Sequence, residues 1–284
     1  MNRMASWDDV QERASAILAE GLYRLTSEPF CQSINLLDLH PCNYLVSYHE
    51  TPLYVGEASA AKSRIRTQFD ERRSTFYRNY LSTNPDTIIT ISSFNLQLIE
   101  TRVGRKEIED FGIVNLPTSL NRFQLGKRSL YRRAVSHAQW DSVQVEYSRL
   151  VEEGAARCMD TEFSPWPNAI SPNGPGIYLI RDGNGRIVYV GESSDVGARY
   201  LTHSGRTYFS AVRRNLGTDI LGYTLQTRNG KKRYFDPPED REISSFLERC
   251  LVAFYPVNFG RYEVEEFLIG NLKPILNRKS KNPE

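Results

Sequence analysis

The sequence predicts an α/β (α+β) fold of two tandem small domains, each with a central antiparallel β-sheet flanked by helices, related by a pseudo-two-fold. The main observation is an internal repeat. Residues 7–21 and 140–154 are identical at seven of fifteen positions, and residues 104–121 and 260–277 at ten of eighteen. A tyrosine-containing hairpin pattern follows the first matched segment in each half. A repeat this long is a domain rather than a solenoid unit, so we expect domains at 1–135 and 136–284.

Composition limits the class of protein. The chain has 284 residues, a formal net charge of +2 and 25% charged residues, as in globular domains. It shows no run of eighteen apolar residues and no apolar leader, so we expect a cytoplasmic protein without a membrane span. The four cysteines are far apart, which argues against a disulfide framework or a zinc site. Basic clusters at 126–133, 228–235 and 277–282 are either phosphate contacts or solvated surface charge.

Each half is predicted to begin with a helix. Apolar residues recur at helical spacing in 7–21 and in 140–154. Trp7-Asp8 and Trp140-Asp141 stand at the starts of these helices, where an aspartate suits the helix dipole and a tryptophan packs. These pairs are also candidates for docking one half on the other.

The second half contains the clearer hairpin. Residues 176–180 and 186–190 are runs of β-branched and aromatic residues joined by Asp-Gly-Asn-Gly, which predicts two strands and a tight turn. We expect Gly191 to end the second strand. In the first half, residues 42–59 give a related pattern in which Cys42-Asn43 replaces Gly-Ile.

Two helices follow the hairpin in the second half. Ser194 or Asp195 is expected to cap a helix from about residue 196, on which Arg199 and His203 share a face because they are four residues apart. Apolar residues at 264, 267, 268 and 272 predict a later helix with Glu265 on its other side, closed by Pro274. The charged, glycine- and proline-containing insertion around 228–241 is predicted to be a loop that touches a ligand.

These residues together resemble the GIY-YIG nuclease family, a small α/β catalytic module. The two motifs stand as Gly176-Ile177-Tyr178 and Tyr189-Val190-Gly191, followed at family spacing by Arg199, His203, Glu265 and Asn277. The first half keeps Tyr44, Tyr54, Gly56, Arg64, Glu109 and Asn121, and has Gln68 at the histidine position. The resemblance covers most of both halves. Singly, such tyrosines are more often packing residues and such Glu and Arg residues surface ion pairs, so the argument depends on their joint spacing.

The resemblance implies a phosphodiesterase mechanism. Glu265, and Glu109 in the first half, would hold one Mg²⁺ (or Mn²⁺), which suits carboxylate oxygen and water. Arg199 would bind phosphate. Tyr178, aided by His203 or a nearby cation, would act as general base, although a phenol needs its pKa lowered for this. Tyr189 would orient phosphate or water, and Asn277 would brace the site; the matching first-half residues are Tyr44, Tyr54, Arg64 and Asn121.

Two copies suggest a restriction or genome-defence enzyme that cuts both strands of double-stranded DNA as a monomeric pseudo-dimer. An alternative has one active C-terminal site, with the first half as a DNA-binding or structural module, because Gln68 cannot take a proton as histidine can; such an enzyme would nick, or act on particular DNA structures. A non-catalytic nucleic-acid-binding protein is a third possibility. Candidate base-reading residues are the insertion and Arg206, Arg213 and Arg214.

Overall fold

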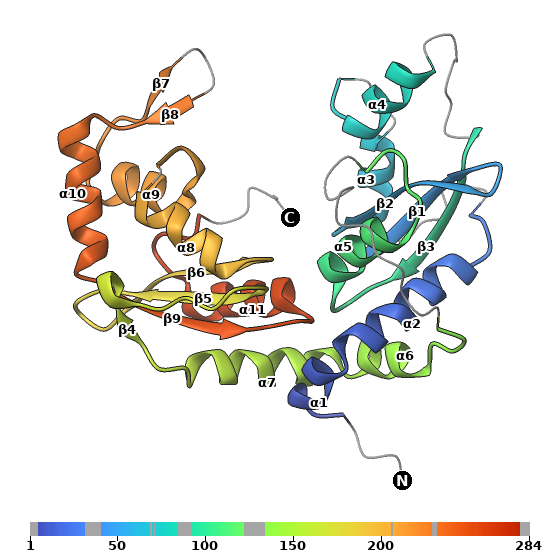
Figure 1. Cartoon of the computed structure of the whole chain (residues 1–284), viewed down its shortest axis with the longest axis horizontal. Coiled ribbons are helices and arrows are strands. Elements are labelled where there is room, and N and C mark those ends of the chain that lie inside the picture. Colours follow the sequence, from blue (N-terminus) through green and yellow to red (C-terminus); the bar gives the residue numbers. More distant parts are fainter. Residues whose placement is uncertain are drawn as a thin grey trace. The chain divides into compact units, whose positions relative to one another are not determined.

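The computed structural model describes residues 5–31, 41–68, 70, 72–84, 93–121, 134–205, 207–228 and 232–278. The protein is a mixed α+β protein with antiparallel sheets (Figure 1). It divides into two compact units, Met1–Leu150 and Val151–Glu284. This division falls later than the 135/136 boundary given by the repeat, because the helix at 138–145 packs against a helix of the first unit.

The first unit is built on a three-stranded sheet with the order β2-β1-β3. The strands are β1 (Cys42–Tyr48), β2 (Thr51–Ala58) and β3 (Asn95–Glu100). His49 and Glu50 form the β1–β2 turn in the left-handed region, with φ of 45° and 64°, the backbone that two-residue hairpins favour. In this hairpin Tyr44 lies opposite Gly56, and the register shifts between Val46 and Ser47. The expected hairpin in the first half is therefore confirmed.

The helices of the first unit are α1 (Trp7–Glu12), α2 (Ala14–Ser27), α3 (Ala61–Gln68), α4 (Thr75–Thr83), α5 (Arg105–Asn115) and α6 (Ala138–Val145). The single helix predicted over 7–21 is wrong: it breaks at Arg13, whose amide donates back to Asp9 and so closes α1 before α2 begins. The second predicted helix breaks at the matching position, Glu146, between α6 and α7 (Tyr147–Met159). The repeat therefore conserves a break that apolar spacing does not reveal.

Glu20 of α2 caps the N-terminus of α6. Its buried carboxylate accepts hydrogen bonds from the backbone amides of Gln139 (2.7 Å) and Trp140 (3.1 Å). Two amides that α6 cannot satisfy internally are thereby paired with a negative charge. Trp140 is buried beside Gly21, where an added Cβ would lie 2.5 Å from the indole. The Trp140 helix start thus docks on α2 within the first unit.

The second unit contains a four-stranded sheet with the order β4-β9-β5-β6. Its strands are β4 (Ser164–Pro165), β5 (Gly176–Arg181), β6 (Ile187–Ser193) and β9 (Leu251–Pro256). The predicted hairpin is β5–β6, in which Tyr178 lies opposite Gly191 and the register shifts between Ile180 and Arg181. Both features match the first unit. Gly191 lies inside β6 rather than ending it.

The second unit also contains helices and one small separate hairpin. They are α8 (Val196–Gly205), α9 (Ala211–Asn215), α10 (Pro237–Glu248), α11 (Arg261–Leu272), and the hairpin β7 (Gln226–Arg228) and β8 (Lys232–Tyr234) (Figure 1). Asp195 caps α8, because its Oδ1 accepts from the amide of Ala198 at 2.9 Å. Helix α11 follows Gly260 with φ 81°, as α5 follows Gly104 with φ 88°. This left-handed turn requires glycine at both starts.

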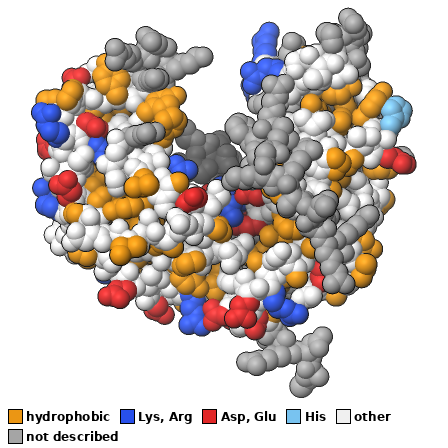
Figure 2. Space-filling model, viewed as in Figure 1, with side chains coloured by type: hydrophobic (Ala, Val, Ile, Leu, Met, Phe, Trp, Pro, Cys, Tyr) orange, Lys and Arg blue, Asp and Glu red, His pale blue; other side chains and the backbone are white. Residues whose placement is uncertain are grey.

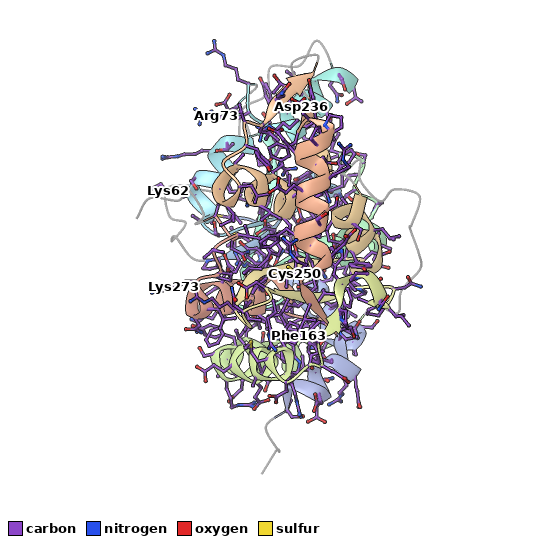
Figure 3. The ribbon with its side chains drawn as sticks, turned by 90° about the vertical axis from the view of Figure 1, so that its left-hand side faces the viewer. Lys62, Arg73, Phe163, Asp236, Cys250 and Lys273 are labelled. Carbon is purple, nitrogen blue, oxygen red and sulfur yellow. The ribbon has the colours of Figure 1, made fainter. Side chains whose placement is uncertain are left out.

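The insertion around 228–241 is not only a loop. It contains β8 and the first turn of α10, which begins with a capping box between Asp236 and Glu239. Figure 3 shows Asp236 at one end of α10 and Cys250 beyond the other. The prolines that predict a loop instead occupy the first turn of α10, where a missing amide hydrogen costs nothing.

Each unit has its own apolar core. In the second unit, Tyr178, Ile180 and Val212 belong to one buried cluster, and in the first unit Tyr44, Val46 and Ile65 belong to another. On α11, Val264 and Leu268 are buried as predicted, whereas Phe267 and Leu272 are each 36% exposed. In the described part of the chain no helix is long and apolar enough to cross a membrane.

Candidate functional site

The second unit places its two motif tyrosines on one face of the β5–β6 hairpin. The rings of Tyr178 and Tyr189 lie 5.9 Å apart between centroids and are stacked. A Cβ on Gly191 would lie 2.4 Å from the Tyr178 hydroxyl and 2.7 Å from the Tyr189 ring. Gly191 therefore leaves the space that the Tyr178 side chain occupies. Tyr178 is 3% exposed, whereas Tyr189 is only partly buried.

His203 of α8 joins this pair from the next element. Its Nε2 lies 2.7 Å from the Tyr178 hydroxyl, and its Nδ1 lies 2.7 Å from Ser210 Oγ. The Ser210 oxygen also accepts a hydrogen bond from the Arg213 amide at the start of α9. The predicted closeness of Tyr178 and His203 is thus present, and Ser210 extends it.

Glu265 and Asn277 lie along the edge of β6. Asn277 pairs with both the amide and the carbonyl of Val190, at 2.8 and 2.7 Å. Glu265 Oε1 accepts from the amide of Glu192 at 3.1 Å. Amides of residues 190 and 192 point the same way from an edge strand, so Asn277 and Glu265 lie along the same edge of β6. The charge of Glu265 is close enough to Tyr189 to raise the pKa of that tyrosine. Asn277 thus braces β6, the strand that carries Tyr189.

The electrostatics of this group oppose ionisation of its phenols. Burial, followed by the nearby Glu265 charge, raises the pKa of Tyr189 to about 12, and burial raises the pKa of Tyr178 well above its ordinary value. Arg199 acts in the opposite direction on both tyrosines. Burial, then the cations Arg199, Arg213 and Arg214, lowers the pKa of His203 to about 3. At neutral pH the imidazole is therefore uncharged.

The first unit repeats these contacts with one substitution. The rings of Tyr44 and Tyr54 stack with centroids 6.1 Å apart, and a Cβ on Gly56 would lie 2.4 Å from the Tyr44 hydroxyl. Gln68 occupies the histidine position and its Nε2 donates to the Tyr44 hydroxyl at 2.8 Å. Ser74 Oγ donates to Gln68 Oε1 at 3.1 Å, as the counterpart of Ser210.

A cavity of about 270 Å³ opens on this first group. Its lining includes Tyr54, Arg64, Gln68, Glu109 and Asn121. Tyr44 is fully buried behind it. Five of the seven first-half motif residues named from the sequence thus line one cavity, and of the two motif tyrosines it is Tyr54 that lines it.

Glu109 is the acidic group of that cavity. Burial, followed by the charges of Glu57 and Asp110, raises the pKa of its carboxyl to about 8, and Arg64 partly offsets this. Asn121 pairs with the amide and carbonyl of Val55 at 2.9 and 2.8 Å, matching the Asn277 contacts. The brace is therefore identical in the two units.

Behind each site lies an ion pair. Glu192 Oε2 is 2.9 Å from Arg261 Nε, and Glu57 Oε2 is 3.8 Å from Arg105. The arginines start α11 and α5 and are nearly fully buried. These contacts give Glu57 and Glu192 a role in holding the helix that carries the site glutamate.

The candidate base-reading residues divide into three cases. Arg213 as a DNA contact is wrong: it is 1% exposed and pairs with Asp240 at 2.9 Å. Arg206 and residues 229–231 lie outside the described residues. Arg214 is partly buried, and burial, followed by the charges of Arg233 and Arg278, lowers its pKa. Arg233 and Arg278 therefore lie near Arg214, on whose pKa the Tyr189 charge acts in the opposite direction.

Sequence reasoning missed the two serines. Each caps a short helix, Ser210 through the amide of Arg213 and Ser74 through the amide of Tyr77. The available signal was a serine six or seven residues after the His/Gln position in both halves, followed by a helical segment.

Comparison with known proteins gives no further guide: no protein-family model, curated protein or solved structure matches this chain. Among the described residues there is also no group of three or more His, Cys, Asp and Glu side chains placed to hold a metal ion. A cation here would depend on a single carboxylate and water.

Proposed function

We propose that the chain is a Mg²⁺-dependent endonuclease for double-stranded DNA, with one phosphodiesterase site in each unit. One observation carries the proposal. A tyrosine pair over a glycine, a polar partner for the buried tyrosine, an arginine, a glutamate and a strand-bracing asparagine occur together twice, on matching elements and with matching contacts. Packing alone would not require the same polar set in both units.

The donor set suits a hard cation. Glu109 is a desolvated carboxylate beside a second acidic residue, Glu57, and its pKa is raised to about 8. A divalent cation relieves such a combination, because it favours the ionised carboxylate. Glu265 has the same position on α11. When bound, the cation supplies charge neutralisation at the phosphoryl and leaving oxygens.

The protein groups divide the remaining tasks. Arg64 and Arg199 hold a permanent charge near the tyrosines and would bind a phosphoryl oxygen. Tyr54 lines the cavity, so its hydroxyl would orient the attacking water. It would accept the proton of that water when a nearby positive charge, such as that of Arg64, lowers its pKa. Tyr44 and Tyr178 are too buried to reach water directly, and they would act through Tyr54 and Tyr189.

On the face shown in Figure 2, Lys and Arg side chains are interspersed with Asp and Glu over α7 and α10, so DNA contacts on this face would be local. Arg214, Arg233 and Arg278 form a cationic group near the second site, in which Arg278 also pairs with Asp219 at 2.8 Å. Such a cluster would bind the phosphate that flanks the cut bond.

Two sites in one chain fit an enzyme of the restriction or genome-defence type, because each strand of the duplex could be cut without a second chain. The alternative, one active site in the second unit, depended on Gln68 being unable to replace histidine. Gln68 makes the same two contacts as His203, so this observation no longer favours it.

The test uses supercoiled plasmid and Mg²⁺ with Glu109→Gln, Glu265→Gln and the double variant. We expect the wild-type chain to give linear product, each single variant to give nicked circles, and the double variant to give neither. Asp110→Asn and Glu266→Gln, which neighbour the glutamates on the same helices, are the matched controls. Linear product unchanged in Glu109→Gln would support the single-site alternative, and no Mg²⁺-stimulated cleavage on any DNA substrate would refute nuclease function.

A further inference from the structure

The contacts of Ser210, and those of its counterpart Ser74 in the first unit, favour one tautomer of His203. Ser210 Oγ accepts the amide hydrogen of Arg213 at 3.0 Å, so its own hydrogen is available to His203 Nδ1 at 2.7 Å. A neutral imidazole that accepts at Nδ1 carries its hydrogen on Nε2. His203 Nε2–H then donates to the Tyr178 oxygen at 2.7 Å.

Tyr178 lies between His203 and the second motif tyrosine. Its ring stacks on that of the partly buried Tyr189, with the centroids 5.9 Å apart. The chain of donors therefore runs from Ser210 through His203 to the Tyr178 oxygen.

The charged and titratable groups around His203 keep it neutral. It is 1% exposed, and it faces Arg199 from α8, Arg213 and Arg214 from α9, and the rings of the two tyrosines from β5 and β6. All three charges are positive. A positive charge on the ring would be opposed by burial and by these arginines together.

In the first unit, Gln68 stands at the position of His203 and shows which hydrogen bonds that position makes. Ser74 Oγ accepts from the amide of Tyr77 at 3.0 Å and donates to Gln68 Oε1, and Gln68 Nε2 donates to Tyr44. A glutamine amide thus presents one acceptor and one donor at the places where the Nε2–H imidazole presents them. It cannot take up a proton.

We propose that His203 and Gln68 are positioning residues that donate a hydrogen bond to the buried tyrosine. Ser210 and Ser74 fix their orientation. Neither His203 nor Gln68 acts as a proton acceptor. The inference rests on the proposed nuclease function for its catalytic meaning. It assigns the two serines to the sites and makes the first site equivalent to the second in its hydrogen bonding.

The first test needs no cleavage. In the full chain labelled with ¹⁵N-histidine, long-range ¹H–¹⁵N spectra report the tautomer of each ring, and comparison with His203→Gln assigns the signal. We expect the Nε2–H form at pH 7 and no charging of the ring down to pH 5. An Nδ1–H form, or an imidazolium at neutral pH, would overturn the inference whether or not the chain is a nuclease.

The second test measures cleavage in the Glu109→Gln background, where only the second site would act. His203→Ala is expected to lose at least about tenfold in rate, and His203→Gln to restore most of that loss with an unchanged pH profile. A general base contributes about 10²–10⁴-fold. The inference would therefore be overturned if His203→Gln were as inactive as His203→Ala although circular dichroism showed that it is folded.

The reciprocal exchange covers the first site. In the Glu265→Gln background, Gln68→His is expected to retain nicking and Gln68→Ala to lose it. A failure of the parent chain to cut DNA contradicts the nuclease proposal and leaves the spectroscopic test to decide the tautomer.

Discussion

Acid should destabilise the second unit through His203. The folded state holds this ring neutral with a pKa of about 3, whereas the ordinary value is 6.5. The unfolded chain therefore binds a proton below pH 6.5 that the folded chain does not. The contribution of the neutral His203 ring to the free energy of unfolding is therefore fully present above pH 6.5, and it is lost progressively as the pH falls toward 3. At pH 5 the loss is about 2 kcal/mol, from 1.36 kcal/mol per pH unit over 1.5 units.

The assay compares thermal unfolding of the wild-type chain and His203→Gln at pH 7.5 and pH 5. Other titrating groups, including Glu109, are common to both proteins and cancel in the difference. We expect the wild type to lose about 2 kcal/mol more than the variant, which for a unit of this size is a shift of roughly 5–10 °C in Tm.

His49→Asn is the control, because His49 is exposed and asparagine tolerates its φ of 45°. This variant should follow the wild type at both pH values. Parallel pH dependence of the wild type and His203→Gln would show that the buried imidazole titrates normally, and the reasoning from burial would be refuted.

Three further outcomes are expected. Gly191→Ala should abolish cleavage and lower the free energy of unfolding by about 3 kcal/mol or more, because the added Cβ would overlap Tyr178. Gly183→Ala, whose Cβ would have nothing within 4 Å, should be near neutral, and equal melting curves for the two variants would contradict this reasoning. Glu20→Ala should destabilise the chain by about 1–3 kcal/mol and the exposed Glu12→Ala by less than about 0.5, measured by urea unfolding. Arg233→Ala should weaken DNA binding for all sequences and reduce the slope of affinity against salt by about one; an unchanged slope would exclude a phosphate contact.

Local sequence signals predicted the parts of the fold that depend on neighbouring residues. The β5–β6 hairpin, the Asp195 cap and the α11 segment before Pro274 are all set by turn, cap and spacing chemistry. The matching first-half hairpin followed from the repeat. These signals are short in range and so are readable from sequence.

Long-range contacts account for what was missed. An arginine such as Arg213 is expected at the surface from sequence alone, and its ion pair with Asp240 forms only in the folded chain. Glu20 caps a helix that begins more than a hundred residues later, and Ser210 becomes part of a site only when α8 and α9 meet. The partners in each case lie on different elements, so no local pattern could have indicated them.

The asparagine brace on β2 and β6 also bears on how the chain folds. Asn121 and Asn277 each occupy one amide and one carbonyl of a sheet-edge strand. Nearby, Leu120 and Leu276 donate from their amides to Leu53 and Val188. A strand edge paired in this way offers fewer groups to another strand. A chain with two similar hairpins risks pairing a strand of one with the sheet of the other. The brace closes each sheet with a segment from its own repeat, and so favours correct pairing over exchange between the halves.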